Sequence, residues 1–217
     1  MAFDDRFDAV IFDMDGTMLD SMSHWRRINY DFLERRGLQP PADIRENLMF
    51  IHNKQAIARY IQEFHLPLSP EEILEEYRAI MRGYYLGAVL PKPYLFTYLS
   101  HLKLRGKRMC VGTATPAAIA RPALERHGIL EHMEFILSAR DEDIGKGDPA
   151  FYRLAAGKLG LSPARCALFD DAPYAMRGAK TAGLTVLAMA EPIQAPLKEE
   201  ILSLCDLYVH DFGQLCV

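Results

Sequence analysis

Residues 9–17 have the sequence AVIFDMDGT, and this stretch decides the fold. Its first four residues are apolar and lack the polar alternation of a half-exposed strand, which indicates a strand buried on both faces. Asp13 ends the apolar run, and Asp15 and Gly16 follow it in a segment with the composition of a turn. An ordinary loop has the same composition, so the ends of the other strands decide whether the two carboxylates belong to a site.

Similar apolar runs recur along the chain and alternate with helical segments. Thr115-Pro116 offers an N-cap with proline in the first turn of a helix, and Pro122 is expected to kink or divide that helix. Asp148-Pro149 repeats the cap signal, and residues 172–182 are expected to form a helix that Gly183 ends. The alternation predicts an α/β fold, a Rossmann-like parallel sheet core with helices on both faces. The further strands are expected at residues 109–111, 134–137, 167–169, 184–189 and 207–209.

Residues 21–90 interrupt this alternation with a block of helical patterns. Trp25, Ile28 and Phe32 share one helical face, and Ser69-Pro70-Glu71-Glu72 is a capping box that opens another helix. A helical block between the first and second strands indicates an insertion. We therefore expect residues 1–20 and 91–217 to form the Rossmann-like core and residues 21–90 to form an inserted α-helical cap domain.

The composition limits the kinds of partner. Half of the 217 residues are hydrophobic and a quarter are charged, as in an ordinary globular protein. The formal net charge of −4 argues against nucleic acid as a partner, because neutralising phosphates along a strand favours a basic face. A small phosphorylated metabolite needs only a local positive site, so the overall acidity does not oppose one.

We expect no targeting segment. The first residues of the chain are acidic and no apolar stretch has the length of a membrane span, so we expect a cytoplasmic protein without a membrane partner. We expect it to be a monomer or a weak homodimer. Cys110 and Cys166 lie inside apolar runs, which indicates core positions rather than redox or metal sites.

Polar side chains also stand at the ends of the later strands. A threonine follows the second core strand, a lysine precedes the helix that begins near residue 148, and two adjacent aspartates follow the 167–169 strand. In an open parallel sheet, ligands bind at the carboxyl ends of the strands near the switch in strand order. We therefore expect one crevice to contain Asp13, Asp15, Thr113, Lys146, Asp170 and Asp171.

This ordered set resembles the haloacid dehalogenase superfamily, in its branch of phosphatases and β-phosphoglucomutase-like proteins. Residues 12–21, FDMDGTMLDS, are close to the first motif of that family, and the resemblance extends from about Val10 to Met189. It also includes a helical cap at the family's first insertion position. The resemblance implies a phosphoric monoester hydrolase with a Rossmann-like core.

The resemblance assigns the catalytic roles, and the chemistry of the side chains agrees with them. Asp13 stands at the family's position for a nucleophile, and a carboxylate that attacks phosphorus divides hydrolysis into formation and breakdown of an aspartyl-phosphate. Asp15 lies two residues further on. It can protonate the leaving group and then accept a proton from the attacking water.

The carboxylates are also expected to hold a metal ion. Two carboxylates about 4 Å apart repel by roughly 4 kcal/mol at an effective dielectric near 20, so such a cluster needs a cation. Ligation by oxygen alone favours Mg²⁺. The expected ligands are Asp13, Asp15, Asp170 and Asp171.

The phosphate group is expected to meet donors from three segments. Thr113 offers its hydroxyl and Lys146 a positive charge, while the backbone at Gly16 and Ala114 is expected to add N–H groups. Within the cap, His52, Asn53 and Lys54 stand where a loop should face the site. These three side chains have two open interpretations: they contact substrate, or they cap and solubilise the next helix.

These observations favour a Mg²⁺-dependent phosphatase that hydrolyses small phosphorylated metabolites through an aspartyl-phosphate. A phosphosugar mutase of the β-phosphoglucomutase type shares the same motifs and is the alternative enzyme. Receiver domains of signalling proteins use the same residue types, but their acidic pair precedes the phosphorylated aspartate. A non-catalytic regulatory protein that binds phosphate would have no need of an acid/base group, so the presence of Asp15 argues against that alternative.

Overall fold

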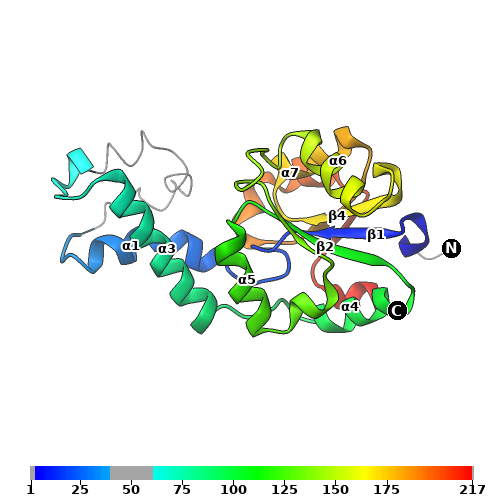
Figure 1. Ribbon diagram of the computed structural model, residues 1–217, viewed down its shortest axis with the longest axis horizontal. Coiled ribbons are helices and arrows are strands. Elements are labelled where there is room, and N and C mark those ends of the chain that lie inside the picture. The colour runs from blue at the N-terminus through cyan, green and yellow to red at the C-terminus, as the bar shows by residue number, and fades with distance from the viewer. Residues whose placement is uncertain (1–2, 40–60, 217) are drawn as a thin grey trace. The chain divides into compact units, whose positions relative to one another are not determined.

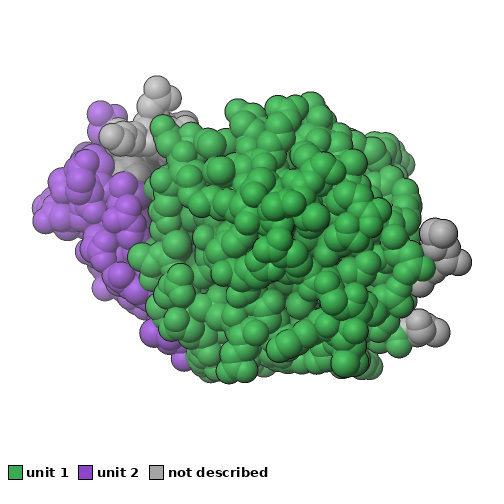
Figure 2. Space-filling view, turned by 45° about the vertical axis from the view of Figure 1, so that its right-hand side comes forward, with its two compact units in different colours: residues 1–20, 90–217 green, residues 21–89 purple. Residues whose placement is uncertain are grey.

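The computed structural model describes residues 3–39 and 61–216, which belong to two compact units (Figure 2). The first unit comprises the described parts of residues 1–20 and 90–217, and the second unit comprises those of residues 21–89. The chain therefore leaves the first unit once and returns to it once.

A six-stranded parallel sheet lies at the centre of the first unit, as the sequence predicted (Figure 1). The strand order is β3-β2-β1-β4-β5-β6. The chain adds β2 and β3 on one side of β1 and then returns to place β4 on the other side. The switch in strand order therefore lies between β1 and β4. The strands are β1 (Ala9–Phe12), β2 (Arg108–Thr113), β3 (Ile136–Ser138), β4 (Cys166–Asp170), β5 (Thr185–Met189) and β6 (Leu207–Val209).

The register of the central strands determines which residues meet at the edge of the sheet. All four residues of β1 are buried. Phe12 pairs with Val111 on β2 and with Phe169 on β4, and its ring stacks on that of Phe169 with centroids 5.5 Å apart. The residues after Phe12 and Phe169 are Asp13 and Asp170, so the pairing places these two carboxylates side by side.

Helices cover both faces of the sheet. Figure 1 shows α6 and α7 on one face and α4 and α5 on the other. Among the described residues, no helix is both long and apolar enough to cross a membrane. The helices of this unit are α4 (Leu95–Leu104), α5 (Ala117–Arg126), α6 (Pro149–Lys158), α7 (Pro173–Ala182) and α8 (Lys198–Leu204).

Three details differ from the sequence prediction. Pro116 is the N-cap residue of α5, and Thr115 makes no capping bond to this helix, so the predicted threonine cap was wrong. Pro122 lies inside α5 without dividing it. β3 begins at Ile136, two residues later than expected, although the backbone N–H of Glu134 still donates to the Met109 carbonyl at 2.8 Å.

The second unit is built from α1 (Met22–Glu34) and α3 (Pro70–Gly87), and its described residues contain no strand. The predicted capping box is present: the Ser69 side chain accepts from the backbone N–H of Glu72, and the Glu72 carboxylate accepts from that of Ser69. A buried bond joins the two helices, since the Tyr77 hydroxyl donates to Asn29 Oδ1 at 2.9 Å. Burial raises the pKa of Tyr77, so this hydroxyl keeps its proton.

The two connections to this insertion run beside each other. The backbone N–H of Asp20 donates to the Leu90 carbonyl at 2.9 Å, and that of Lys92 donates to the Met18 carbonyl at 2.8 Å. The Lys92 ammonium also pairs with Glu191, with 2.6 Å between Nζ and Oε2, and both side chains are largely buried. The pair anchors the returning chain to the segment after β5.

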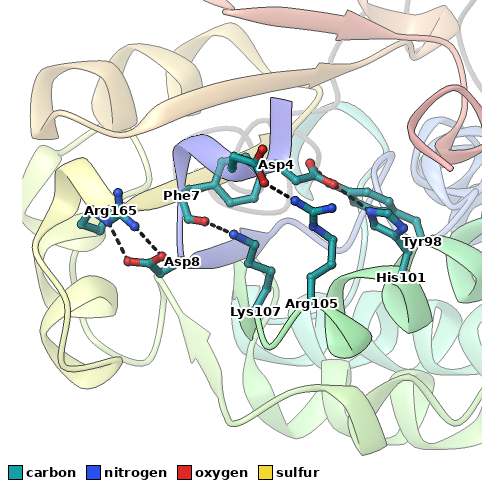
Figure 3. A network of polar contacts seen from close by, with 9 residues as sticks. Asp4, Phe7, Asp8, Tyr98, His101, Arg105, Lys107 and Arg165 are labelled. Atoms are coloured by element: carbon teal, nitrogen blue, oxygen red, sulfur yellow. Dashed lines mark hydrogen bonds and ion pairs between the residues drawn. The ribbon is translucent and has the colours of Figure 1, made fainter. Parts of the chain in front are cut away.

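A polar network fastens the chain ahead of β1, at the edge of the sheet opposite to Asp13 (Figure 3). The Tyr98 hydroxyl donates to the buried carboxylate of Asp4 at 3.1 Å, and His101 lies 3.2 Å from its second oxygen. Arg165 makes a two-pronged ion pair with Asp8 at 2.5 and 2.6 Å. These contacts fix the chain at the N-terminal end of β1. None of these residues faces the carboxylates at the C-terminal end of the strand.

Candidate active site

The predicted strand ends come together beside the switch in strand order. Asp13 follows β1 and its backbone N–H donates to the Phe169 carbonyl at 2.8 Å. Asp170 is the last residue of β4, and Asp171 follows it. Thr113 is the last residue of β2, the other strand that pairs with β1. All four side chains are buried.

Lys146 lies between two of these carboxylates. Its ammonium is 2.5 Å from Asp13 Oδ1 and 2.6 Å from Asp170 Oδ2. Only 2% of the side chain is exposed, which excludes an ordinary solvated lysine. Burial disfavours its charge, but Asp13 and Asp170 together raise the pKa of Lys146 well above its usual value. The lysine is therefore a fixed positive charge beside Asp13.

Gly178 on α7 keeps the backbone of the lysine loop in place. A Cβ atom at this position would lie 2.5 Å from the carbonyl oxygen of Lys146 and 2.9 Å from that of Gly147. The helix and the loop therefore pack closer than any side chain permits. This contact explains how a residue outside any strand is held against Asp13.

Asp13, Asp170 and Asp171 form a group that could hold a metal ion. One oxygen from each carboxylate lies within 4.8 Å of the others, and no second such group was found in the part of the chain that the structure describes. Gln194 supports it from the turn after β5, because its Nε2 donates to Asp171 Oδ2 at 3.1 Å. The carboxylate of Asp15, which was expected among the ligands, is not part of this group.

The charge of the group fits a divalent cation. Three buried carboxylates face one ammonium, which leaves an excess of negative charge. Burial raises the pKa of Asp13 well above its usual value, with Asp170 and Asp171 adding to the rise and Lys146 opposing it. Burial and the Asp170 charge likewise raise the pKa of Asp171 to about 7. A bound cation would remove this penalty, since it favours the ionised form of each ligand.

Asp15 is held by a threonine instead. The Thr115 hydroxyl donates to Asp15 Oδ2 at 2.8 Å, and the backbone N–H of Thr115 donates to Thr113 Oγ1 at 3.0 Å. Because that N–H occupies a lone pair of Thr113, the hydroxyl proton of Thr113 is directed elsewhere. The arrangement suits donation from Thr113 to a phosphate oxygen.

The backbone donors expected from sequence are partly engaged. Gly16 has φ +82°, a left-handed conformation that favours glycine, and its N–H donates to the Leu19 carbonyl at 2.9 Å. A phosphate contact through this N–H would require that bond to open. At the start of α5, the N–H of Ala117 donates to the Asp141 carboxylate at 2.9 Å. Ala114 is partly exposed between the two threonines.

Sequence reasoning missed Thr115 and Gln194. Thr115 precedes a proline, so its pattern indicated a helix cap. Gln194 lies in a short 3₁₀ helix, Pro192–Leu197, that no apolar periodicity marks. His52, Asn53 and Lys54, the predicted substrate contacts of the cap, fall in residues 40–60, outside the described residues.

The protein is therefore an α/β protein with a Rossmann-like sheet. At the switch point of this sheet, a buried acidic group that could hold a metal ion lies with a lysine and a threonine that suit a phosphate group. A family comparison agrees: residues 7–183 match the haloacid dehalogenase-like hydrolases, and the chain belongs to this family.

Curated relatives and solved structures show the same similarity. Hexitol phosphatase A of Escherichia coli is 31% identical over 98% of this chain and 94% of its own length. Fructose-1-phosphate phosphatase YqaB of the same organism is 30% identical over 83% of this chain and 95% of its own. A crystal structure of a putative β-phosphoglucomutase from Thermotoga maritima has a TM-score of 0.81 at 19% identity and covers 97% of both chains. At that identity, the last similarity concerns the fold alone.

Proposed function

We propose that this phosphatase hydrolyses phosphate monoesters of small polyols and sugars through an aspartyl-phosphate formed on Asp13. The observation that carries the proposal is the position of Asp13, 2.5 Å from a buried lysine and grouped with Asp170 and Asp171 at the switch point of the sheet. The two curated relatives support the substrate class, since one is a hexitol phosphatase and the other a fructose-1-phosphate phosphatase.

The side chains divide the reaction between them. The Asp13 carboxylate attacks phosphorus, and the bond between phosphorus and the leaving oxygen breaks. The leaving oxygen keeps the electron pair of that bond and accepts a proton from Asp15. Water then attacks the aspartyl-phosphate and gives its proton to Asp15, and the phosphorus bond to Asp13 breaks. Lys146 and Thr113 hold the phosphate oxygens throughout, as a fixed charge and a hydroxyl donor.

Asp13, Asp170 and Asp171 would hold a Mg²⁺ ion in this proposal. Oxygen ligands alone and a partly wet site are what Mg²⁺ prefers. When bound, the ion neutralises charge on the nucleophile and the phosphate. Gln194 orients one ligand from outside, a kind of contact whose loss typically costs about 10- to 100-fold in metal affinity.

The proposal is tested by phosphate release over a panel of sugar, polyol and nucleotide monophosphates in the presence of Mg²⁺. Polyol and sugar phosphates are expected to give the highest kcat/KM, with inorganic phosphate and the free alcohol as products. A parallel incubation with β-glucose 1-phosphate and a trace of the 1,6-bisphosphate, followed by ³¹P NMR, checks the mutase alternative. Accumulation of glucose 6-phosphate with little inorganic phosphate would contradict hydrolysis as the function.

The metal site predicts a specific dependence of thermal stability on pH. The folded-state pKa of Asp171 is raised from 3.8 to about 7, so the metal-free folded protein holds a proton that the unfolded chain has released. Stability contributed by this group therefore falls as pH rises through that interval. We expect MgCl₂ to raise the Tm, relative to EDTA, more at pH 8 than at pH 5.5.

Differential scanning fluorimetry at both pH values measures this effect without requiring activity. Asp171→Asn is the matched control, because it removes the titrating group and should reduce the difference between the two pH values. A Tm at pH 8 that MgCl₂ leaves unchanged would contradict the metal site.

A further inference from the structure

Thr115 makes a contact that its place in the chain does not explain. The side chain is buried, and its hydroxyl donates to Asp15 Oδ2 at 2.8 Å. The residue is not the N-cap of α5, and it makes no capping bond to that helix. Helix stability therefore does not account for the hydroxyl.

The backbone holds this hydroxyl in a fixed position relative to Thr113. The N–H of Thr115 donates to Thr113 Oγ1 at 3.0 Å, which ties the backbone of Thr115 to the Thr113 side chain. Threonine is β-branched, which restricts rotation about its first side-chain torsion. An aspartate carboxyl, by contrast, has a broad terminal torsion and needs an external contact to fix its plane. Thr115 supplies such a contact for Asp15.

We propose that Thr115 is a positioning residue that orients Asp15 for proton transfer to the leaving oxygen. Its hydroxyl donates to Oδ2 and so helps to fix the plane of the Asp15 carboxyl. A general acid must stand within hydrogen-bond reach of the atom that it protonates, and a small misplacement slows the transfer. This inference rests on the proposed function, since it gives Asp15 the role of acid.

The experiment separates leaving groups by their need for a proton. A polyol or sugar alkoxide is a strong base and leaves only when protonated, whereas p-nitrophenolate is a weak base and leaves unaided. The substrates are the alkyl phosphate with the highest kcat/KM in the panel and p-nitrophenyl phosphate. The parameter kcat/KM is used because it covers the steps through departure of the alcohol and excludes later hydrolysis of the aspartyl-phosphate.

Thr115→Val keeps the shape of the side chain and removes the hydroxyl. We expect kcat/KM for the alkyl phosphate to fall about 10- to 100-fold and that for p-nitrophenyl phosphate to change by less than about threefold. Thr115→Ser retains the hydroxyl and should restore most of the loss. Thr181→Val is the matched control, because it removes a hydroxyl bond of the same 2.8 Å length, to the Arg177 carbonyl, outside the site. It should leave the ratio of the kcat/KM values for the two substrates unchanged.

Asp15→Asn separates the failure of this inference from that of the proposed function. Suppose that Asp15→Asn lowers kcat/KM for the alkyl phosphate much more than for p-nitrophenyl phosphate. If Thr115→Val then lowers both values equally, or changes neither of them, the positioning role of Thr115 is overturned. If Asp15→Asn itself slows both substrates equally, Asp15 is not the acid, and the role of Thr115 fails with it. Far-UV circular dichroism of each variant checks the fold, and Thr115→Ala, which also removes the hydroxyl, keeps the test decisive if Thr115→Val does not fold.

Discussion

Asp13→Asn is expected to reduce phosphate release by at least about 10⁴-fold, as the loss of a catalytic nucleophile does elsewhere. An amide oxygen is a poor nucleophile, so no aspartyl-phosphate forms. The side chain keeps its size, and Lys146 retains Asp170 as a partner at 2.6 Å, so the fold should persist. Because the change removes one of three clustered carboxylates, the Tm in EDTA should equal or exceed that of the wild type.

The covalent step can be observed directly. Wild-type protein quenched during turnover of a ³²P-labelled substrate should carry label on the protein, and Asp13→Asn should carry none. Asp8→Asn is a matched control at the other end of β1, where the carboxylate is exposed and pairs with Arg165. It should retain activity. Appreciable turnover by an Asp13→Asn preparation free of deamidated protein would rule out the covalent mechanism.

Lys146→Met is expected to reduce both activity and stability. Removing one partner of a buried ion pair typically costs about 3–5 kcal/mol, because the remaining charge is left without compensation. Here the remaining charges are the carboxylates of Asp13 and Asp170. Burial raises the pKa of Asp13 well above its usual value, so this carboxylate can take up a proton at low pH. The loss in the free energy of unfolding should therefore be larger at pH 8 than at pH 5.5. Activity should fall at least about 100-fold, because the positive charge that faces the phosphate is lost.

Urea unfolding in EDTA at the two pH values measures the stability change. Lys158→Met provides the control, since this lysine is exposed at the end of α6 and should leave both stability and activity near the wild-type values. A Lys146→Met protein with wild-type unfolding at pH 8 would show that the lysine does not neutralise the buried carboxylates.

The positions of the strands along the chain and their polar ends could be predicted from sequence because both depend on local patterns. A buried strand such as β1 is an uninterrupted apolar run, and the residue after it must lie at the edge of the sheet. Asp13, Asp170 and Asp171 were found in this way, and the structure brings them together. The helix beginning at Asp148 was also predictable, because its N-cap and proline are adjacent in sequence.

The contacts between distant segments could not be predicted. Thr115 and Asp15 are 100 residues apart, and no local pattern distinguishes a hydroxyl that binds a carboxylate from one that caps a helix. Gln194 reaches Asp171 from a turn without periodicity. Gly178 appears in sequence as an unfavourable residue within a helix, and only its approach to the Lys146 carbonyl gives the reason for it.

The paired connections at residues 18–20 and 90–92 make the insertion replaceable as a module. The backbone atoms of Asp20 and Leu90 are joined by one hydrogen bond of 2.9 Å, so a short turn could close the first unit if residues 21–89 were absent. Any other insert whose two ends lie this close could occupy the same place without altering the strand register. Exchange of this segment between related proteins would therefore leave the carboxylates, the lysine and the threonines where the sheet holds them.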